Sequence, residues 1–201
     1  IRSNPQFAKL SIIDTWLPDP FVAWMTHAMS SPTSTLLDLT LREVQWSPSA
    51  CLQLVHGLRC HDRIERLDVS NTLWHQSSQI SLANYLENNK TIQEFKIASL
   101  VDPSMIAIVL DACVQNPSLK CISIARNLLN ASCMSSLATL LKLHPSLEEL
   151  DLSNCWAEDA TCWDDVLSAL SSNDSLKTIS LERCYMGDKG ATAIGLSLIH
   201  I

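Results

Sequence analysis

The 201-residue chain has few aromatic rings, few glycines and few charges. It contains three Phe, two Tyr and four Gly, and 17% of its residues are charged. The longest uninterrupted apolar run, 105–110, has six residues, whereas a helix needs about 20 to span a bilayer. The motifs GxxxxGK[ST], GxGxxG, GxSxG and HExxH do not occur. We therefore expect no membrane span, no nucleotide-binding loop, no cofactor and no enzymatic activity.

Basic residues are also scarce. The chain has 14 Lys and Arg against 21 Asp and Glu, a formal net charge of -7. Domains that bind nucleic acid usually carry a basic excess on one face, so nucleic acid is not an expected partner. The 47% of hydrophobic residues is enough to bury a core and excludes extensive disorder.

The eight cysteines are scattered among Leu, Ala and Ser in apolar segments. An even number of cysteines in a short secreted chain would suggest a disulfide framework. Here the chain is long and leucine-rich, and reduced Cys in such segments behaves as a small hydrophobic residue. We interpret this as a reducing environment and predict a cytoplasmic location.

The best metal candidate is the group Cys51, His56, Cys60 and His61, which lies within eleven residues. It lacks the paired CxxC spacing of strong zinc sites, and Cys51 falls in the apolar stripe of a predicted helix. We therefore predict no metal site.

One apolar pattern recurs along the chain at a nearly constant interval. Seven nine-residue segments, among them LLDLTLREV and LEELDLSNC, have apolar residues at their first, fourth and sixth positions. We number the positions of each repeat from the first residue of this segment and call the numbering the template. The segments start at Phe7, Leu36, Ile64, Ile92, Leu119, Leu147 and Leu176. Such an even spacing of the starts indicates internal repeats.

Each segment is followed by a stretch in which the apolar residues have helical spacing, such as SPSACLQLVHGL and SCMSSLATLLKL. Ser, Thr, Asp or Pro near the start is typical of helix caps and first turns. Clusters such as QNPSL and LHPSL end the stretches, because proline cannot continue a helix. The predicted unit is strand, loop, helix, loop, which stacks into a solenoid of parallel strands.

The pattern LxxLxLxxN/C with one helix per unit resembles the leucine-rich repeat, ribonuclease-inhibitor-like subclass. The resemblance covers residues 7 to about 196 and is strongest in LKTISLERCYMGDKGATAIG. It implies an α/β fold, a right-handed horseshoe-shaped solenoid with parallel strands on the concave face and helices on the convex face. Residues 1–201 are then a single repeat array. The subclass also includes the repeat arrays of nucleotide-binding immune receptors and of Ran GTPase-activating proteins, which are intracellular.

Both ends of the array are expected to be truncated, because terminal repeats normally carry polar caps. The opening SNPQF matches the junctions QNPSL and LHPSL, which indicates another repeat upstream, and the apolar segment PDPFVAWMTHAM suits contact with that neighbour. The tail LSLIHI resembles translated adapter sequence, with a genuine apolar helix end as the alternative.

Template positions 2, 3, 5, 7 and 8 are predicted to point away from the core, because side chains alternate along a strand. These positions hold ten acids and eight bases, about half of all the charges of the chain, although they make up only about a sixth of its length. A wall of mixed charge favours specific protein binding; the alternative is a solvated surface without a partner. The charged residues expected to contact a partner are Arg42, Arg66, Asp68, Arg126, Glu149, Asp151 and Arg183.

Tryptophans add two candidates. Trp16 and Trp156 occupy position 10, just beyond the strand, where an exposed Trp would anchor a partner; the alternative is a ring folded under its own loop. The other four are expected to pack in the interior, at position 11 or in helices: Trp46, Trp74, Trp24 and Trp163.

Position 9 is the place where the family has Asn or Cys, whose side chains satisfy backbone groups between repeats. Its occupants are Thr15, Val44, Thr72, Leu100, Asn127, Cys155 and Cys184. Three of the seven fit the family pattern, so we expect an imperfect ladder that deviates at Leu100. A disulfide between Cys155 and Cys184 is conceivable, but reduced thiols are the preferred interpretation.

The leading hypothesis for function is a non-enzymatic scaffold that binds another protein through its strand face. One alternative is a small-GTPase regulator resembling Ran GTPase-activating proteins, which act by stabilising the GTPase's own catalytic arrangement. Another is the sensing array of a nucleotide-binding immune receptor, which would require an upstream P-loop.

Overall fold

The computed structural model describes residues 7–99, 102–157, 163–184 and 186. The predicted truncations and the tail LSLIHI lie outside these residues or at their limits. Seven strands form the main sheet: β1 (Lys9–Trp16), β2 (Asp38–Gln45), β3 (Arg66–Asp68), β4 (Glu94–Lys96), β5 (Cys121–Ser123), β7 (Glu149–Asp151) and β9 (Thr178–Ser180). The helices are α1 (Asp19–Met29), α2 (Pro48–Arg59), α3 (Gln76–Asn88), α4 (Pro103–Val114), α5 (Ala131–Leu143) and α6 (Trp163–Ser171).

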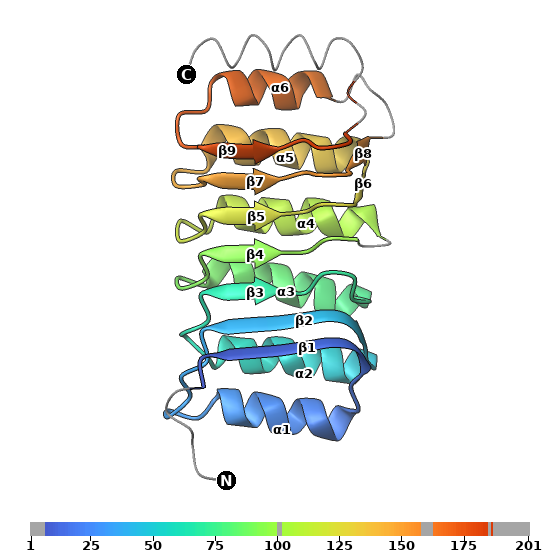
Figure 1. The fold of residues 1–201 in the computed structure, drawn as a ribbon, viewed down its shortest axis with the longest axis vertical. Helices are drawn as coiled ribbons and strands as arrows, with labels where there is room; N and C mark the ends of the chain where they lie inside the picture. Colours follow the sequence, from blue (N-terminus) through green and yellow to red (C-terminus); the bar gives the residue numbers. More distant parts are fainter. Residues whose placement is uncertain (1–6, 100–101, 158–162, 185, 187–201) are drawn as a thin grey trace.

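The sheet follows the order of the chain, and every pair of neighbouring strands is parallel. A helix follows each of the first six sheet strands, and the helices stack in a second layer against one face of the sheet (Figure 1). A short parallel pair, β6 (Leu128–Leu129) and β8 (Trp156–Ala157), lies beside the ends of β5 and β7. The predicted α/β class with a parallel sheet is confirmed.

Strand pairing places residues of the same template position opposite one another. Leu39 pairs with Leu67, Leu67 with Phe95, and Phe95 with Ile122, all at position 4. These side chains are almost fully buried between the sheet and the helices. A column of this kind fixes the register, because a slip of one residue would turn every apolar side chain to the solvent.

The helices begin where a short polar side chain can cap them. Ser47 accepts a hydrogen bond from the amide of Ala50, and Asn130 accepts one from the amide of Cys133. Asp102 caps α4 in the same way, and a proline follows it in the first turn. These side chains satisfy amides that have no partner within the helix.

The chain leaves each strand through a left-handed residue at template position 8. Seven residues other than glycine have φ between 52° and 59°, and each is the eighth of its repeat. They are Asp14, Glu43, Asn71, Ser99, Arg126, Asn154 and Arg183. Repeating the same turn in every unit keeps the following residues in register from one repeat to the next.

At four of the position 9 residues the side chain then donates a hydrogen bond back to the preceding repeat, whereas Val44 has no side-chain donor. The acceptor is each time the carbonyl at position 6 of that repeat. The pairs are Thr72 Oγ1 to Leu41 (2.9 Å), Asn127 Nδ2 to Ile97 (3.0 Å), Cys155 Sγ to Ile124 (3.2 Å) and Cys184 Sγ to Leu152 (2.9 Å). The expectation that only Asn and Cys fill this role was wrong for Thr72, because its hydroxyl is also a donor of suitable length. Leu100 lies outside the described residues.

A second ladder at the opposite ends of the strands was not predicted. It consists of the polar residue three places before each template start: His61, Asn89, Asn116, His144 and Asn173. Asn116 donates to the carbonyl of Leu86 (2.7 Å) and Asn173 to that of Leu141 (2.6 Å). His61 Nε2 lies 2.8 Å from the carbonyl oxygen of Leu36, and His144 Nε2 lies 2.9 Å from that of Asn116. Asn89 differs, because it donates to Tyr85 Oη and accepts from the amides of Thr91 and Ile92. The other four side chains tie the beginnings of their strands to the preceding repeat.

The first prediction concerns the position 9 ladder. Asn127→Ala removes the donor to two buried carbonyls, those of Ile97 (3.0 Å) and Ile124 (2.7 Å). The carbonyl of Ile124 keeps Cys155 Sγ as a donor (3.2 Å), but that of Ile97 loses its side-chain donor, so the free energy of unfolding should fall by about 1–3 kcal/mol. Asn127→Cys should lose much less, because Cys155 makes the equivalent bond in the next repeat. Equilibrium denaturation in urea measures both variants, and equal losses would contradict the ladder's role.

The second prediction concerns pH. Burial lowers the pKa of His144, although the hydrogen bond to the carbonyl of Asn116 opposes the shift. The unfolded chain therefore binds this proton more readily, and stability should fall as the pH drops below about 6.5, levelling off below the folded pKa. His144→Asn, which places an asparagine where Asn116 stands one repeat earlier, should remove this part of the loss.

The measurement is the free energy of unfolding at several pH values between 7.5 and 5. An unchanged pH dependence in His144→Asn would show that the ladder histidine does not couple folding to protonation.

Candidate partner-binding face

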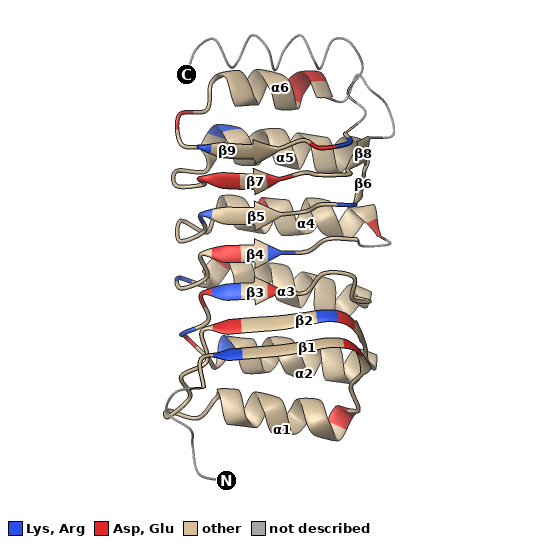
Figure 2. Ribbon diagram, viewed as in Figure 1, with Lys and Arg blue, Asp and Glu red and all other residues tan. Residues whose placement is uncertain are grey.

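The side chains at template positions 3, 5 and 7 point away from the helices, and we call the surface that they form the sheet face. Figure 2 shows that charged residues lie mainly on the strands and at their ends, whereas the helices are largely uncharged. The buried alternate positions explain this placement, because residues at positions 4 and 6 face the core.

The sheet face begins with charges of alternating sign on neighbouring strands. At position 3, Lys9, Asp38, Arg66 and Glu94 follow one another across β1 to β4. Asp38 Oδ2 lies 3.2 Å from Lys9 Nζ and 3.2 Å from Arg66 Nε. Asp38 is only 8% exposed, so its charge is compensated by the two cations that flank it. Arg66, a predicted contact residue, is therefore held in place by an ion pair.

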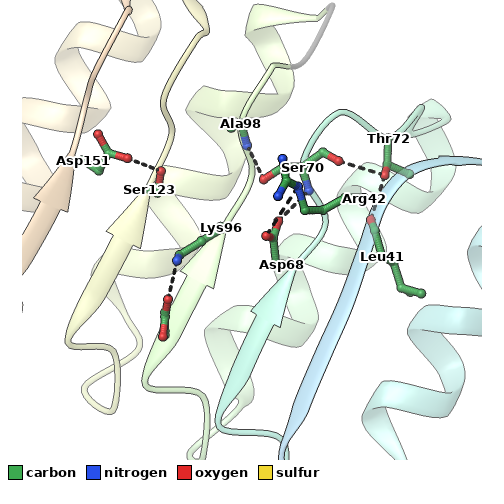
Figure 3. Close-up of polar contacts among 10 residues, drawn as sticks. Leu41, Arg42, Asp68, Ser70, Thr72, Lys96, Ala98, Ser123 and Asp151 are labelled. Atoms are coloured by element: carbon green, nitrogen blue, oxygen red, sulfur yellow. Dashed lines mark hydrogen bonds and ion pairs between the residues drawn. The ribbon is translucent and has the colours of Figure 1, made fainter. Parts of the chain in front are cut away.

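Asp68 and Arg42 form a second, looser pair on the same face (Figure 3). Arg42 Nε lies 3.9 Å from Asp68 Oδ2. The other carboxylate oxygen of Asp68 accepts the amide hydrogen of Ser70 (3.0 Å), and Ser70 Oγ accepts the amide hydrogen of Ala98 (3.0 Å). Asp68 thus supports the backbone of its own repeat and Ser70 that of the next, while the half-exposed Arg42 extends over the face.

Asp151 has the same position 5 role three repeats later. Its carboxylate accepts hydrogen bonds from Ser123 Oγ (2.8 Å) and from the amide of Ser153 (2.9 Å). Partial burial alone would raise its pKa, but these hydrogen bonds and the charge of Lys96 lower the pKa below its usual value. Asp151 stays ionised at neutral pH and is a structural partner as well as a surface charge.

Further charges lie toward the second half of the sheet. Lys96 Nζ bonds Glu94 Oε1 at 2.6 Å, which raises the pKa of Lys96. Glu149 is exposed, and it forms no ion pair with a described residue. The exposed Arg183 lies 3.5 Å from Glu182.

Arg126 stands at the strand end, outside the flat part of the face. It is exposed, has φ 58°, and its guanidinium has no ion-pair partner among the described residues. A shallow hollow of about 440 Å³ lies over β1 to β4, lined in part by Lys9, Arg42, Arg66 and Lys96.

The tryptophans divide as predicted with one exception. Trp16 and Trp156 are 63% and 58% exposed, so neither is folded under its loop. Trp46 and Trp74 are buried and pack edge to face with ring centroids 5.6 Å apart, and Trp163 is also buried. The prediction for Trp24 is wrong. This ring is 52% exposed and lies against Phe21, because α1 packs on α2 along one side and the described chain supplies no helix on the other.

The four residues considered for zinc have other surroundings. Cys51 Sγ donates to Ser78 Oγ, and burial raises the pKa of Cys51 to about 11, which disfavours the thiolate that a metal needs. His61 faces the carbonyl of Leu36, and His56 lies beside Cys60 at 4.0 Å. Among the described residues, no group of three or more His, Cys, Asp or Glu is arranged to hold a metal ion.

The described cysteines are all free thiols: Cys51, Cys60, Cys113, Cys121, Cys133, Cys155 and Cys184. Burial raises the pKa of Cys155 to about 12 and also raises the pKa of Cys184. Both thiols donate to backbone carbonyls, as the reduced interpretation requires. No helix in the described part of the chain is long and apolar enough to cross a membrane.

Comparison with known proteins finds a distant similarity to a curated protein. No protein-family model matches the chain. NACHT, LRR and PYD domains-containing protein 9 of Bos taurus is 24% identical over 202 residues, which cover 98% of this chain and 20% of that protein. The chain therefore spans about a fifth of the length of the curated relative that it matches.

Among solved structures, the tropomodulin C-terminal domain of Caenorhabditis elegans aligns with a TM-score of 0.48 and 12% identity, covering 98% of this chain and 84% of that chain. The relative's name contains LRR, the abbreviation for leucine-rich repeat. That relation and the parallel sheet with a helix after each of its first six strands fit a leucine-rich-repeat-like protein.

A third prediction separates structural from free charges on the same strand. Asp151→Ala leaves the amide of Ser153 and the hydroxyl of Ser123 without their acceptor, and should lower the free energy of unfolding by about 1–3 kcal/mol. Glu149→Ala, two residues earlier on β7, should change it by less than about 0.5 kcal/mol. Urea denaturation of the two variants measures the difference. A loss as large for Glu149→Ala would mean that Asp151 has no special structural role.

Proposed function

We propose that this chain is a non-enzymatic protein-interaction array of the ribonuclease-inhibitor-like leucine-rich-repeat type. In this proposal the stack is a right-handed horseshoe-shaped solenoid, the sheet face is its concave face, and that face binds another protein. The proposed site of action is the cytoplasm. The free thiols among the described cysteines support a reducing compartment.

The observation that carries the proposal is the ordered array of charges on the sheet face. Ion pairs and hydrogen bonds hold Arg66, Asp68, Lys96 and Asp151 in defined positions before any partner arrives. Side chains that are already ordered lose less conformational entropy on binding. A fixed pattern of both signs also discriminates between partners by electrostatic complementarity.

A second candidate is the sensing array of a nucleotide-binding immune receptor. It is supported by the similarity to a NACHT, LRR and PYD domains-containing protein, of which this chain matches about a fifth. Sequencing the full-length transcript tests it, since an upstream GxxxxGK[ST] motif is required. The small-GTPase regulator remains an alternative, which a GTP hydrolysis assay with candidate GTPases tests.

The fourth prediction tests the sheet face directly. Protein ligands are first selected from a displayed cDNA library, and their affinities are then measured for the unaltered chain and for Arg42→Gln with Glu149→Gln. Both side chains are exposed on the sheet face. Arg42 has one long ion pair, to Asp68 at 3.9 Å, and Glu149 has no ion pair with a described residue. At least one ligand should bind the double variant at least tenfold more weakly, because the change removes one charge of each sign.

The matched control neutralises charges on the helix layer, Asp111→Asn with Lys142→Gln, and should keep the affinity within about twofold. Melting curves establish that both variants are folded. Ligands that bind the sheet-face variant with full affinity but bind the control variant more weakly would place the binding surface on the helices instead.

A further inference from the structure

A column of exposed side chains, apolar except for Gln45, runs along the strand ends at template position 10. We call it the rim column; its described members are Trp16, Gln45, Leu73, Leu128 and Trp156. Leu73 is 57% exposed and Leu128 is 44% exposed, and the two tryptophans are more exposed still. Trp16 pairs with Gln45 across β1 and β2, and Leu128 pairs with Trp156 across β6 and β8. These side chains therefore lie next to one another in the first two repeats and again in the repeats of β5 and β7, with Leu73 in the repeat that follows the first pair.

The left-handed residues of the turn, which stand two places before the rim column in each repeat, give this edge a charge gradient. Asp14 and Glu43 are acidic at the β1 end, Asn71 and Ser99 are neutral in the middle, and the β9 end has Arg126 and Arg183 with the neutral Asn154 between them. The neighbouring positions do not all follow this order, because Arg42 precedes Glu43 and Glu182 precedes Arg183, so the gradient belongs to position 8 itself. Glu and Arg are unusual in the left-handed region, where Asn, Asp or Gly fits better. Their presence there suggests a use beyond the turn itself.

The acidic end also contains a hollow of about 340 Å³. The carboxylates of Asp14, Glu43 and Asp102 line it, and Leu73 and Trp74 supply apolar walls. Gln79 donates to Asp102 Oδ2 at 3.3 Å and so orients that carboxylate. A space with acidic groups at its edge and apolar walls suits the long apolar stem and charged end of a Lys or Arg side chain.

From these observations we propose that the rim column binds an amphipathic helix of a partner protein, with basic residues at one end and acidic residues at the other. The basic end lies over Asp14 and Glu43 and inserts one side chain into the hollow; the acidic end lies over Arg126 and Arg183. The proposal rests on the proposed protein-binding function but uses a different surface from the sheet face.

The spacing of the repeats supports a helix as the occupant. Neighbouring strands lie about 4.8 Å apart, and one helical turn rises about 5.4 Å, so a helix offers about one apolar side chain to each repeat. From Trp16 to Trp156 there are five strand spacings, roughly 24 Å, which corresponds to about 16 helical residues. Exposed tryptophans at both ends are the residue type that most often anchors such interfaces.

The test is a selection from a displayed library of 18-residue helical peptides. One face is fixed as an apolar stripe, and the polar positions near both ends vary between Lys and Glu. The unaltered chain should enrich peptides with Lys at one end and Glu at the other. A winning peptide should bind at least tenfold more weakly to Trp16→Ala with Trp156→Ala, and a peptide of the same composition with scrambled charges should lose affinity by a similar factor.

Two further variants separate the alternatives. Glu43→Lys with Arg126→Glu abolishes the gradient, and selection against it should give peptides without a preference for opposite ends. Arg42→Gln with Glu149→Gln should bind the winning peptide within twofold of the unaltered chain, so that failure of the sheet-face proposal and failure of this one are distinguishable. Circular dichroism verifies folding. No enrichment over an unrelated acidic protein, or full affinity for the tryptophan double variant, would overturn the proposal.

Discussion

The structure depends on satisfying buried backbone groups where one repeat meets the next. The sheet satisfies the amides and carbonyls in the middle of each strand, but the strand ends turn into loops that are still covered by neighbouring repeats. Asn127 and Cys155 supply donors at one end, and Asn116 and His144 are placed against carbonyls at the other. Buried polar groups left without partners would cost about 1–3 kcal/mol each. The apolar columns provide the driving force for stacking, and these two ladders make the stacked arrangement specific.

Because residues at the same template position have the same structural role in each repeat, the surface positions also form columns. The left-handed residue at position 8 is repeated in all seven repeats, so position 8 forms a column along the strand ends, and the described residues at position 10 stand two places further along the chain. A substitution at a solvent-facing position of one repeat changes one point of a column without moving the others. The fold therefore separates the residues that hold it together from those that are available for binding, with Asp68 and Asp151 as exceptions that do both.

Much of this arrangement follows from the sequence because the apolar period specifies it. The columns at positions 4 and 6 and the helix after each of the first six sheet strands follow from the repeat pattern, whereas the exposure of Trp16 and Trp156 was one of two alternatives that the sequence left open. The hydrogen bond of Thr72 was not predicted, because the expectation named only Asn and Cys. Any side chain with a hydrogen-bond donor of suitable length can take this role. The ladder of His61, Asn89 and their equivalents recurs with the same period as the apolar pattern, and a search for periodicity in polar residues would have found it.

Other features depend on neighbours in space. Trp24 occupies an apolar helix like its counterparts, but burial requires a neighbouring helix on its side of α1, and local sequence does not provide that. Likewise, whether a charge is free depends on the strand beside it: Arg66 is paired because Asp38 stands opposite at the same template position. Counting charges predicts a charged face and leaves open how many of those charges already neutralise one another.

That distinction decides how the two surfaces would contribute to binding. A partner that contacts Lys9, Asp38 or Arg66 competes with ion pairs that already exist, so the net gain in free energy from each contact is small, as for other exposed salt bridges. A partner whose charges complement this pattern binds, whereas a partner with mismatched charges is repelled, and this difference in binding free energy is the basis of specificity. Arg126 has no ion pair among the described residues to give up, and the exposed rings of Trp16 and Trp156 gain from leaving water. We therefore expect the sheet face to select the partner and the strand-end rim to supply most of the affinity.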